Sequence, residues 1–177
     1  MRSLKGTISH GLFYGGYTSV LEGYNDANWI SDTDETNATS GFVYTLVRVV
    51  VAWNSTKQTY ISCTIKAEFI ALDLTGEAAD WFRNLLVDTF LWNKPVPTIL
   101  IHCDSQVVID KTISKTYNEK SKHIHMRYNR TQQLQKYGVI AIYFVKSEKN
   151  LTDLLTKGLS RRQVLKSSRR MGLKPTN

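Results

Sequence analysis

The run TILIHCD, residues 98–104, constrains the fold most, because it is short, almost wholly apolar and followed by a helical pattern. A run of this length and composition is typical of a strand that is buried on both faces of a sheet. The next residues, SQVVIDKTI, return to helical spacing. A doubly buried strand that leads into a helix predicts a parallel strand pair in an α/β fold.

The remaining elements fit the same fold class. Apolar residues recur at helical spacing from Ile65 to about Leu91. The other predicted elements are strands at 19–27, 41–47, 48–53 and 139–145, a helix at 123–137, and a terminal helix opened by NLTDLLTKGLS with Asn150 as its cap. The polar stretch SDTDETNATS between the first two strands is predicted to be a loop. The resulting order, βββαβααβα, predicts a mixed five-stranded sheet flanked by helices.

Length and composition predict one globular domain with a short appendage. The 177 residues can bury a core, and 42% hydrophobic and 21% charged residues are normal values for a globular protein. No apolar run approaches the length of a membrane span, so we expect no membrane partner. The N-terminal segment lacks the apolar core of a signal peptide, so an intracellular compartment and free thiols at Cys63 and Cys103 are expected.

The charge changes sign along the chain. Residues 1–104 carry 7 basic and 11 acidic side chains, whereas residues 105–177 carry 16 and 4. The stretches KSKHIHMRYNR and SRRQVLKSSRR mix aromatic and hydrogen-bonding residues among the cations. This composition suits contacts to a phosphodiester backbone, although a solvated basic surface without a partner is an open alternative.

Four carboxylates fall where the predicted elements begin or end. They are Asp26 near the end of the first strand, Glu68 in the first turn of the long helix, Asp104 after the buried strand, and Asp153 in the first turn of the last helix. Each position has an ordinary explanation as a turn residue, a helix cap or a partner of a helix dipole. One site for a divalent cation explains all four together, because clustered carboxylates repel each other unless cations lie between them. Oxygen ligands favour magnesium or manganese.

Several blocks of the sequence resemble one known family. In order, GYNDANWISD, TSGFVYTL, KAEFIALDLTGEAADWFRNLL, IHCDSQVVI, KSKHIHMRYNR and NLTDLLTKGLS resemble the ribonuclease H domain at the end of copia-type LTR-retrotransposon Pol polyproteins. The resemblance implies a ribonuclease H-like domain at 17–158, preceded by the tail of a reverse transcriptase connection segment at 1–16 and followed by a basic helix or tail at 159–177. It also implies a fragment of a longer polyprotein, located in a cytoplasmic virus-like particle or in the nucleus.

The resemblance implies an activity as well. It maps the metal-binding acids of the family onto Asp26, Glu68, Asp104 and Asp153. The implied reaction is hydrolysis of the RNA strand of an RNA·DNA hybrid by two Mg²⁺ or Mn²⁺ ions. Asp26 would bridge the two ions, Glu68 and Asp104 would complete one site, and Asp153 would support the other. The implied partners are the hybrid and the reverse transcriptase domain of the parent polyprotein.

The basic part of the chain supplies the candidates for contacts to the hybrid. They are Lys122, His123, Arg127, Arg130, Lys157, Arg161 and Arg162. The family has a histidine at the position of His123, which we interpret as a hybrid contact or structural residue rather than a general acid. Selection of RNA over DNA would come from contacts to the 2′-hydroxyl.

One departure from the family pattern bears on folding and activity. TLVRVVVAW places Val and Arg where family members usually have a glycine-rich turn between strands, so the hairpin loses the residues that adopt positive φ readily. An inactive remnant that keeps the fold and binds nucleic acid without cleaving is therefore the alternative function. A third possibility, an integrase, is disfavoured, because integrases usually need acids in the order Asp, Asp, Glu, and the order here is Asp, Glu, Asp, Asp.

Overall fold

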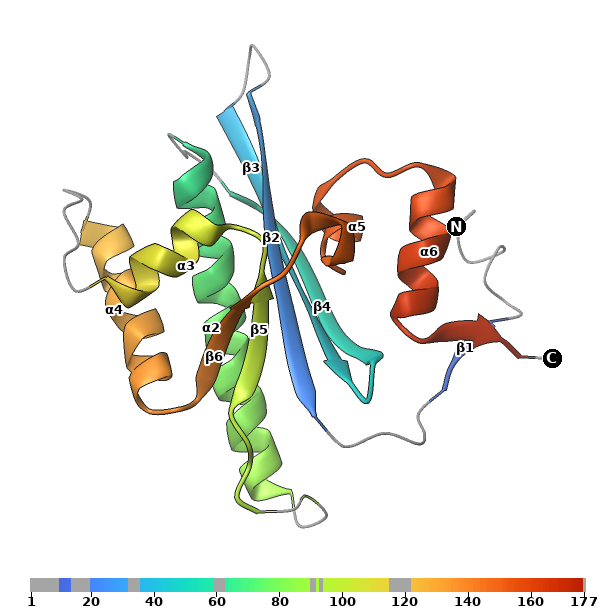
Figure 1. Cartoon of the computed structure of the whole chain (residues 1–177), viewed down its shortest axis with the longest axis horizontal. Helices are drawn as coiled ribbons and strands as arrows, with labels where there is room; N and C mark the ends of the chain where they lie inside the picture. Colours follow the sequence, from blue (N-terminus) through green and yellow to red (C-terminus); the bar gives the residue numbers. More distant parts are fainter. Residues whose placement is uncertain are drawn as a thin grey trace.

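Five strands form one mixed sheet in the order β4-β3-β2-β5-β6 (Figure 1). In this computed structural model, the described residues are 10–13, 20–31, 36–58, 63–89, 92, 94–114 and 122–176. The strands are β2 (Leu21–Ser31), β3 (Thr36–Leu46), β4 (Val49–Gln58), β5 (Ile99–Cys103) and β6 (Ile140–Phe144). The β2–β3 and β3–β4 pairs are antiparallel, whereas β2–β5 and β5–β6 are parallel. The predicted mixed five-stranded sheet is confirmed.

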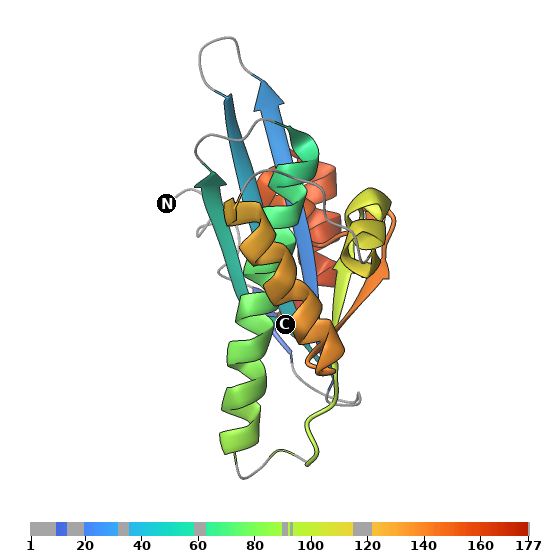
Figure 2. The same cartoon turned by 90° about the vertical axis from the view of Figure 1, so that its left-hand side faces the viewer.

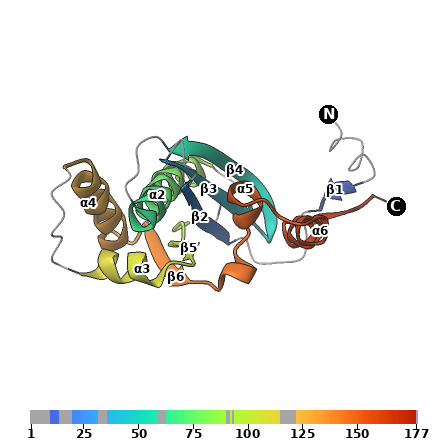
Figure 3. The ribbon, with the colours of Figure 1, turned by 90° about the horizontal axis from the view of Figure 1, so that it is seen from above.

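Helices cover both sides of this sheet. They are α2 (Thr64–Asp88), α3 (Gln106–Ile113), α4 (Lys122–Lys136), the short 3-10 helix η1 (Ser147–Lys149), α5 (Asp153–Thr156) and α6 (Arg161–Arg170). Figure 3 shows α2, α3 and α4 on one side of the strands and α5 and α6 on the other. In Figure 2, α2 and α4 lie together in front of the sheet. Side chains of α5 therefore approach the sheet from the side opposite α2.

The core lies between the sheet and α2. Buried Tyr44 of β3 donates its hydroxyl hydrogen to the carbonyl of Thr75 in α2, and Ile99 and Ile101 of β5 are also buried there. The predicted apolar stripe of the long helix is confirmed by the buried or partly buried side chains of Phe69, Leu72, Ala79, Phe82 and Leu86. Burying each large side chain contributes roughly 1.5–3 kcal/mol, so the packing of α2 on the sheet stabilises the fold.

The first hairpin is longer than the sequence pattern predicts. The stretch 31–40 was expected to be a loop, but β2 continues to Ser31 and β3 begins at Thr36. Ala38 is fully buried opposite Trp29, and it packs with α2 residues Ala67 and Ala71. Packing against a helix thus stabilises strand structure in residues of low strand propensity.

The β3–β4 hairpin turns through Val47 and Arg48, which have φ of 56° and 62°. These are left-handed conformations, which cost an L-residue roughly 1–2 kcal/mol each. The sequence indicated that this turn lacks residues suited to positive φ, and the structure shows that the chain adopts that backbone nonetheless. The flanking register, Leu46 opposite Val49, keeps the hairpin tight.

The C-terminal part departs further from the prediction. The helix opened by NLTDLLTKGLS is only the short α5, and α6 lies where a basic helix or tail was expected. The residue before α5 is Thr152, so Asn150 is not the helix cap. Ser160 caps α6 through a capping box with Gln163. After α6, strand β7 (Leu173–Pro175) pairs antiparallel with β1 (His10–Leu12) in a second sheet, which the sequence did not predict.

The predicted domain limits remain predictions. Residues 1–9 and 14–16 of the expected connection segment lie outside the described residues, as do residues 17–19 at the start of the expected ribonuclease H-like domain. A backbone hydrogen bond of 3.1 Å from Val50 to Met171 joins β4 to the segment after α6. Among the described residues, no helix combines the length and apolar composition needed to cross a membrane.

Candidate active site

Three of the four predicted acids meet at one point of the sheet. The register of parallel strands β2 and β5 pairs Asn25 with Cys103, so the next residues, Asp26 and Asp104, lie at the same level. Glu68 approaches from α2, and one carboxylate oxygen from each of Asp26, Glu68 and Asp104 lies within 4.8 Å of the others. The carboxyl end of β5 thus adjoins β2 at an acidic cluster.

The ordinary explanations for these acids do not hold. Asp26 lies inside β2 opposite Gly41 rather than at a turn. The capping residue of α3 is Ser105, not Asp104. Glu68 lies beyond the first turn of α2, a correction to its expected position, so it is poorly placed to offset the helix dipole. Burying these carboxylates as charged groups is costly unless a cation pairs with them, and otherwise they take up protons.

Burial dominates the electrostatics of this acidic cluster. Asp26 is 1% exposed and Glu68 is 8% exposed. Desolvation, reinforced by the charges of Asp26 and Asp104, raises the pKa of Glu68 from 4.5 to about 8. Desolvation also raises the pKa values of Asp26 and Asp104, against the lowering effect of hydrogen bonds from Thr156 and Ser147 respectively. Without a cation, the cluster resists holding three negative charges.

Two oxygens of the cluster have no partner. Oε2 of Glu68 and Oδ1 of Asp104 are buried and accept no hydrogen bond from any described residue. A buried carboxylate oxygen without a partner is costly in a protein interior. Together with the nearby oxygens of Asp26, these atoms form an all-oxygen donor set that fits Mg²⁺ or Mn²⁺.

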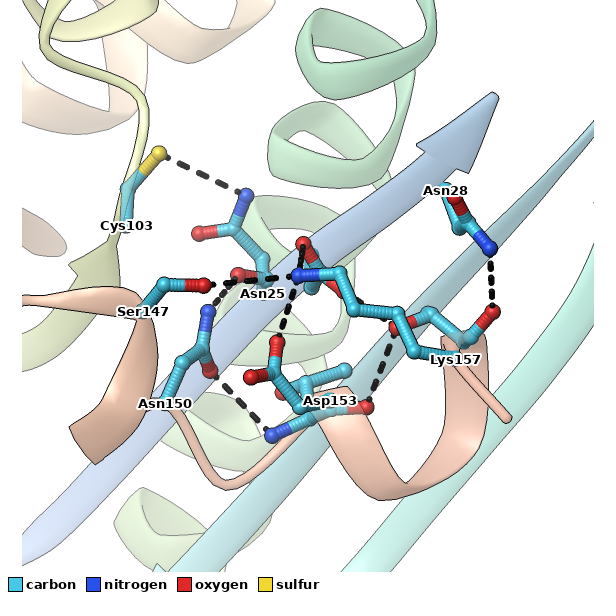
Figure 4. Close-up of polar contacts among 10 residues, drawn as sticks. Asn25, Asn28, Cys103, Ser147, Asn150, Asp153 and Lys157 are labelled. Atoms are coloured by element: carbon cyan, nitrogen blue, oxygen red, sulfur yellow. Dashed lines mark hydrogen bonds and ion pairs between the residues drawn. The ribbon is translucent and has the colours of Figure 1, made fainter. Parts of the chain in front are cut away.

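Asp153, the fourth predicted acid, reaches the cluster through a lysine. It was predicted in the first turn of the last helix, and it is the first residue of α5, which α6 follows. Its Oδ1 accepts a hydrogen bond of 2.7 Å from Nζ of Lys157. The same ammonium donates to Oδ1 of Asp26 at 3.2 Å. Figure 4 shows the Lys157 side chain extending from the end of α5 toward Asp153 and Ser147. Lys157, predicted to contact nucleic acid, thus lies among the predicted metal-binding acids.

Polar residues around α5 hold this arrangement in place. Thr156 donates a hydrogen bond to Oδ2 of Asp26. The buried Asn150 side chain donates to the carbonyl of Asn25 and accepts from the Thr152 amide, which fixes the start of α5 against β2. Sequence reasoning missed these contacts. Only the contact between Asp153 and the lysine four residues later could have been found, since i and i+4 residues share a helix face.

The predicted nucleic-acid contacts divide into two groups. Arg127 and Arg130 of α4 bind the buried carboxylate of Asp73 in α2, at 2.7 Å from Nη1 of Arg127 and 2.7 Å from Nε of Arg130. These two guanidinium groups therefore already have an internal partner. Lys122 and His123, at the start of α4, are exposed.

Arg161 and Arg162, at the start of α6, are exposed as well. Helices α4 and α6 lie on opposite sides of the sheet (Figure 3). The exposed cations of the basic half therefore do not all belong to one flat face.

Relatives of known type match nearly the whole chain. It is 30% identical over 162 residues to the retrovirus-related Pol polyprotein from transposon TNT 1-94 of Nicotiana tabacum, across 91% of this chain and 12% of that protein. It is 29% identical over 175 residues to the Pol polyprotein from transposon RE2 of Arabidopsis thaliana, across 98% of this chain and 12% of that protein. The chain is a homologue of one segment of plant transposon Pol polyproteins. It thus spans about an eighth of their length. No protein-family model matches it.

Solved structures of ribonucleases H and of a reverse transcriptase share the fold of this chain. LC11-RNase H1 in complex with an RNA/DNA hybrid superposes with a TM-score of 0.57 at 18% identity, over 77% of this chain and 93% of that one. The protease-reverse transcriptase of prototype foamy virus gives a TM-score of 0.55 at 18% identity, over 88% of this chain and 22% of that one. The predicted ribonuclease H-like fold is confirmed, and so is the resemblance to copia-type Pol polyproteins.

Proposed function

We propose that this Pol segment is a ribonuclease H that hydrolyses the RNA strand of RNA·DNA hybrids with Mg²⁺ or Mn²⁺. The observation that carries the proposal is the meeting of Asp26, Glu68 and Asp104 within 4.8 Å, with unpaired oxygens on Glu68 and Asp104. The fold supports it, because LC11-RNase H1 shares that fold and was solved with an RNA/DNA hybrid. Homology to Pol polyproteins supports the biological setting, reverse transcription of a retrotransposon.

In the proposed reaction, the acids of this chain hold the divalent ion and position it at the phosphate. Asp26, Glu68 and Asp104 would hold a divalent ion at the scissile phosphate. A bound ion lowers the pKa of an attacking water and stabilises the charge on the leaving oxygen. The hydrogen bonds from Thr156 and Lys157 to Asp26 would keep that carboxylate in one orientation. The expected second ion, supported by Asp153, stays a prediction, since Lys157 now contacts that carboxylate.

The proposed partners follow the same argument. The exposed Lys122 and His123 on α4 and Arg161 and Arg162 on α6 would contact backbone phosphates, which gives affinity without sequence preference. We propose that the domain acts while joined to a reverse transcriptase domain, in the cytoplasm or nucleus of the host cell. Isolated activity is then expected to be weaker than activity in the polyprotein.

The decisive experiment is cleavage of a labelled RNA·DNA hybrid by the purified chain, with Mg²⁺, Mn²⁺ or EDTA. We expect metal-dependent cutting that Asp26→Asn abolishes, because the variant removes a charged ligand, while hybrid binding stays nearly intact. The variant also controls for a contaminating nuclease. Equal cutting by Asp26→Asn would refute the metal assignment. Binding without cutting by the folded wild-type chain would favour the alternative, a remnant that binds nucleic acid without cleaving.

A further inference from the structure

We propose that the Lys157 ammonium fills a second cation position between Asp26 and Asp153. The chain without nucleic acid would then bind one divalent ion, at Asp26, Glu68 and Asp104. A second divalent ion would enter between Asp26 and Asp153 only when the Lys157 side chain leaves. This inference rests on the proposed function, because it assumes that the three-acid cluster binds metal.

The contacts of Lys157 are those of a bound cation. Nζ lies 2.7 Å from Oδ1 of Asp153, 3.2 Å from Oδ1 of Asp26 and 3.4 Å from Oγ of Ser147. An ammonium has three donors and no acceptor, so three surrounding oxygens match its capacity. Two carboxylates and a hydroxyl are also ligands that a hard divalent ion accepts. Figure 4 shows the Ser147 and Asp153 side chains both directed toward the end of this lysine.

The oxygens of the acidic cluster fall into two groups, those that accept a hydrogen bond from the α5 segment and those without a partner among the described residues. Both oxygens of Asp26 are engaged by the α5 segment, Oδ2 by Thr156 and Oδ1 by Lys157. By contrast, the unpartnered oxygens belong to Glu68 and Asp104. The position on the Glu68 side thus needs an external cation, whereas the position on the Asp153 side already has an internal one. The two cation positions therefore differ, because only the one beside Asp153 is filled by a side chain of the protein.

The chain holds Lys157 in this place by local geometry. Asp153 and Lys157 are four residues apart, and α5 ends where the Lys157 amide donates to the Asp153 carbonyl at 3.0 Å. Asn150 fixes the preceding loop to β2. An ion that enters must therefore displace a tethered group, whose local concentration near the carboxylates is on the order of millimolar or higher. The second ion should bind at least about tenfold more weakly than it would without that lysine.

The test counts ions in the absence of nucleic acid. Mn²⁺ binding would be measured by calorimetry and by the electron paramagnetic resonance signal of free Mn²⁺. The variants are Lys157→Met, the double variant Lys157→Met with Asp153→Asn, and Lys166→Met as a matched loss of an exposed lysine on α6. We expect one ion for the wild type and for Lys166→Met, two for Lys157→Met, and one for the double variant.

The outcomes separate this inference from the proposed function. A folded wild-type chain that binds no ion would overturn the metal site itself and the inference with it. Two ions of similar affinity in the wild type would overturn the role of Lys157 alone and leave the metal site standing. The number of ions bound by the wild type therefore tests the inference even if the Lys157→Met variant fails to fold. One ion in a folded Lys157→Met variant would likewise overturn the role of Lys157.

Discussion

Glu68→Gln should stabilise the metal-free chain at about pH 8 and change little at about pH 4. Burial and the charges of Asp26 and Asp104 raise the Glu68 pKa from 4.5 to about 8. Between these values the folded chain binds one more proton than the unfolded chain, so stability is fully present below the lower pKa and is lost as pH rises toward the higher one. At about 1.4 kcal/mol per pKa unit, the loss of stability is about 5 kcal/mol.

The groups next to Glu68 do not reverse the predicted loss of stability with rising pH. The pKa values of Asp26 and Asp104 are also raised by burial, so these acids likewise destabilise the fold as pH rises, beginning from the ordinary value of 3.8. Burial acts to lower the Lys157 pKa, but its hydrogen bond to Asp153 and the charges of Asp26 and Asp153 outweigh burial and raise it. Lys157 therefore stays charged in both states over the tested range.

The assay is urea unfolding with EDTA at intervals from about pH 4 to about pH 8.5. Wild type should lose stability as pH rises, whereas Glu68→Gln should be nearly flat in the upper part of the range. Glu77→Gln is the matched control, because its carboxylate lies on the same helix but is 59% exposed, and it should follow wild type. Saturating Mg²⁺ should remove the loss, since the ion favours ionised ligands. Wild-type stability that rises with pH in EDTA, or an unchanged slope in Glu68→Gln, would refute the reasoning.

Three further changes test other parts of the structure. Val47→Asn should raise the free energy of unfolding by about 1 kcal/mol, because Asn tolerates the positive φ of this turn better than a β-branched residue; an unchanged melting temperature would contradict it. Asp73→Asn should lower the free energy of unfolding by about 1–2 kcal/mol, measured in urea, because Asp73 is buried but its arginine partners are partly exposed. Replacing Arg161 and Arg162 with Ala should weaken hybrid binding and reduce its salt slope by about 2, whereas the same slope as wild type would move the nucleic-acid surface elsewhere.

The sheet and the elements that carry the three-acid cluster could be predicted from the sequence, because apolar runs and helical spacing identify them. The apolar run before Asp104 identifies a parallel strand, although β5 is not fully buried on both faces, because Leu100 and His102 are partly exposed. Helical spacing places Glu68 on the helix that covers this strand. Asp26 was expected near the end of its strand, but β2 continues beyond it to Ser31. Asp26 meets Asp104 because the parallel register places Asn25 opposite Cys103. The contact between Lys157 and Asp153 could have been predicted from their spacing of four residues. Because Lys157 is basic, it was predicted to contact nucleic acid instead.

Long-range partners could not be predicted in the same way. Strand β1 pairs with β7, near the other end of the chain, and neither three-residue strand has a periodic pattern that indicates a partner. The ion pairs of Arg127 and Arg130 depend on how α4 packs against α2, which sequence spacing does not define. The backbone of Val47 is likewise set by the strands that it joins, because the register of β3 and β4 leaves two residues for the turn.

Helix α2 carries two buried acids, Asp73 and Glu68, whose carboxylates differ in their partners. This difference supports a functional role for Glu68. Asp73 is 1% exposed, and both of its oxygens bind guanidinium groups, from Arg127 and Arg130. Glu68, five residues earlier, is almost as buried but keeps an unpartnered oxygen next to two more carboxylates. A chain that supplies internal cations to Asp73, and to Asp26 through Lys157, could in principle have neutralised Glu68 in the same way. The Glu68 oxygen that accepts no hydrogen bond from any described residue therefore supports the proposed site for a cation that is not part of the chain.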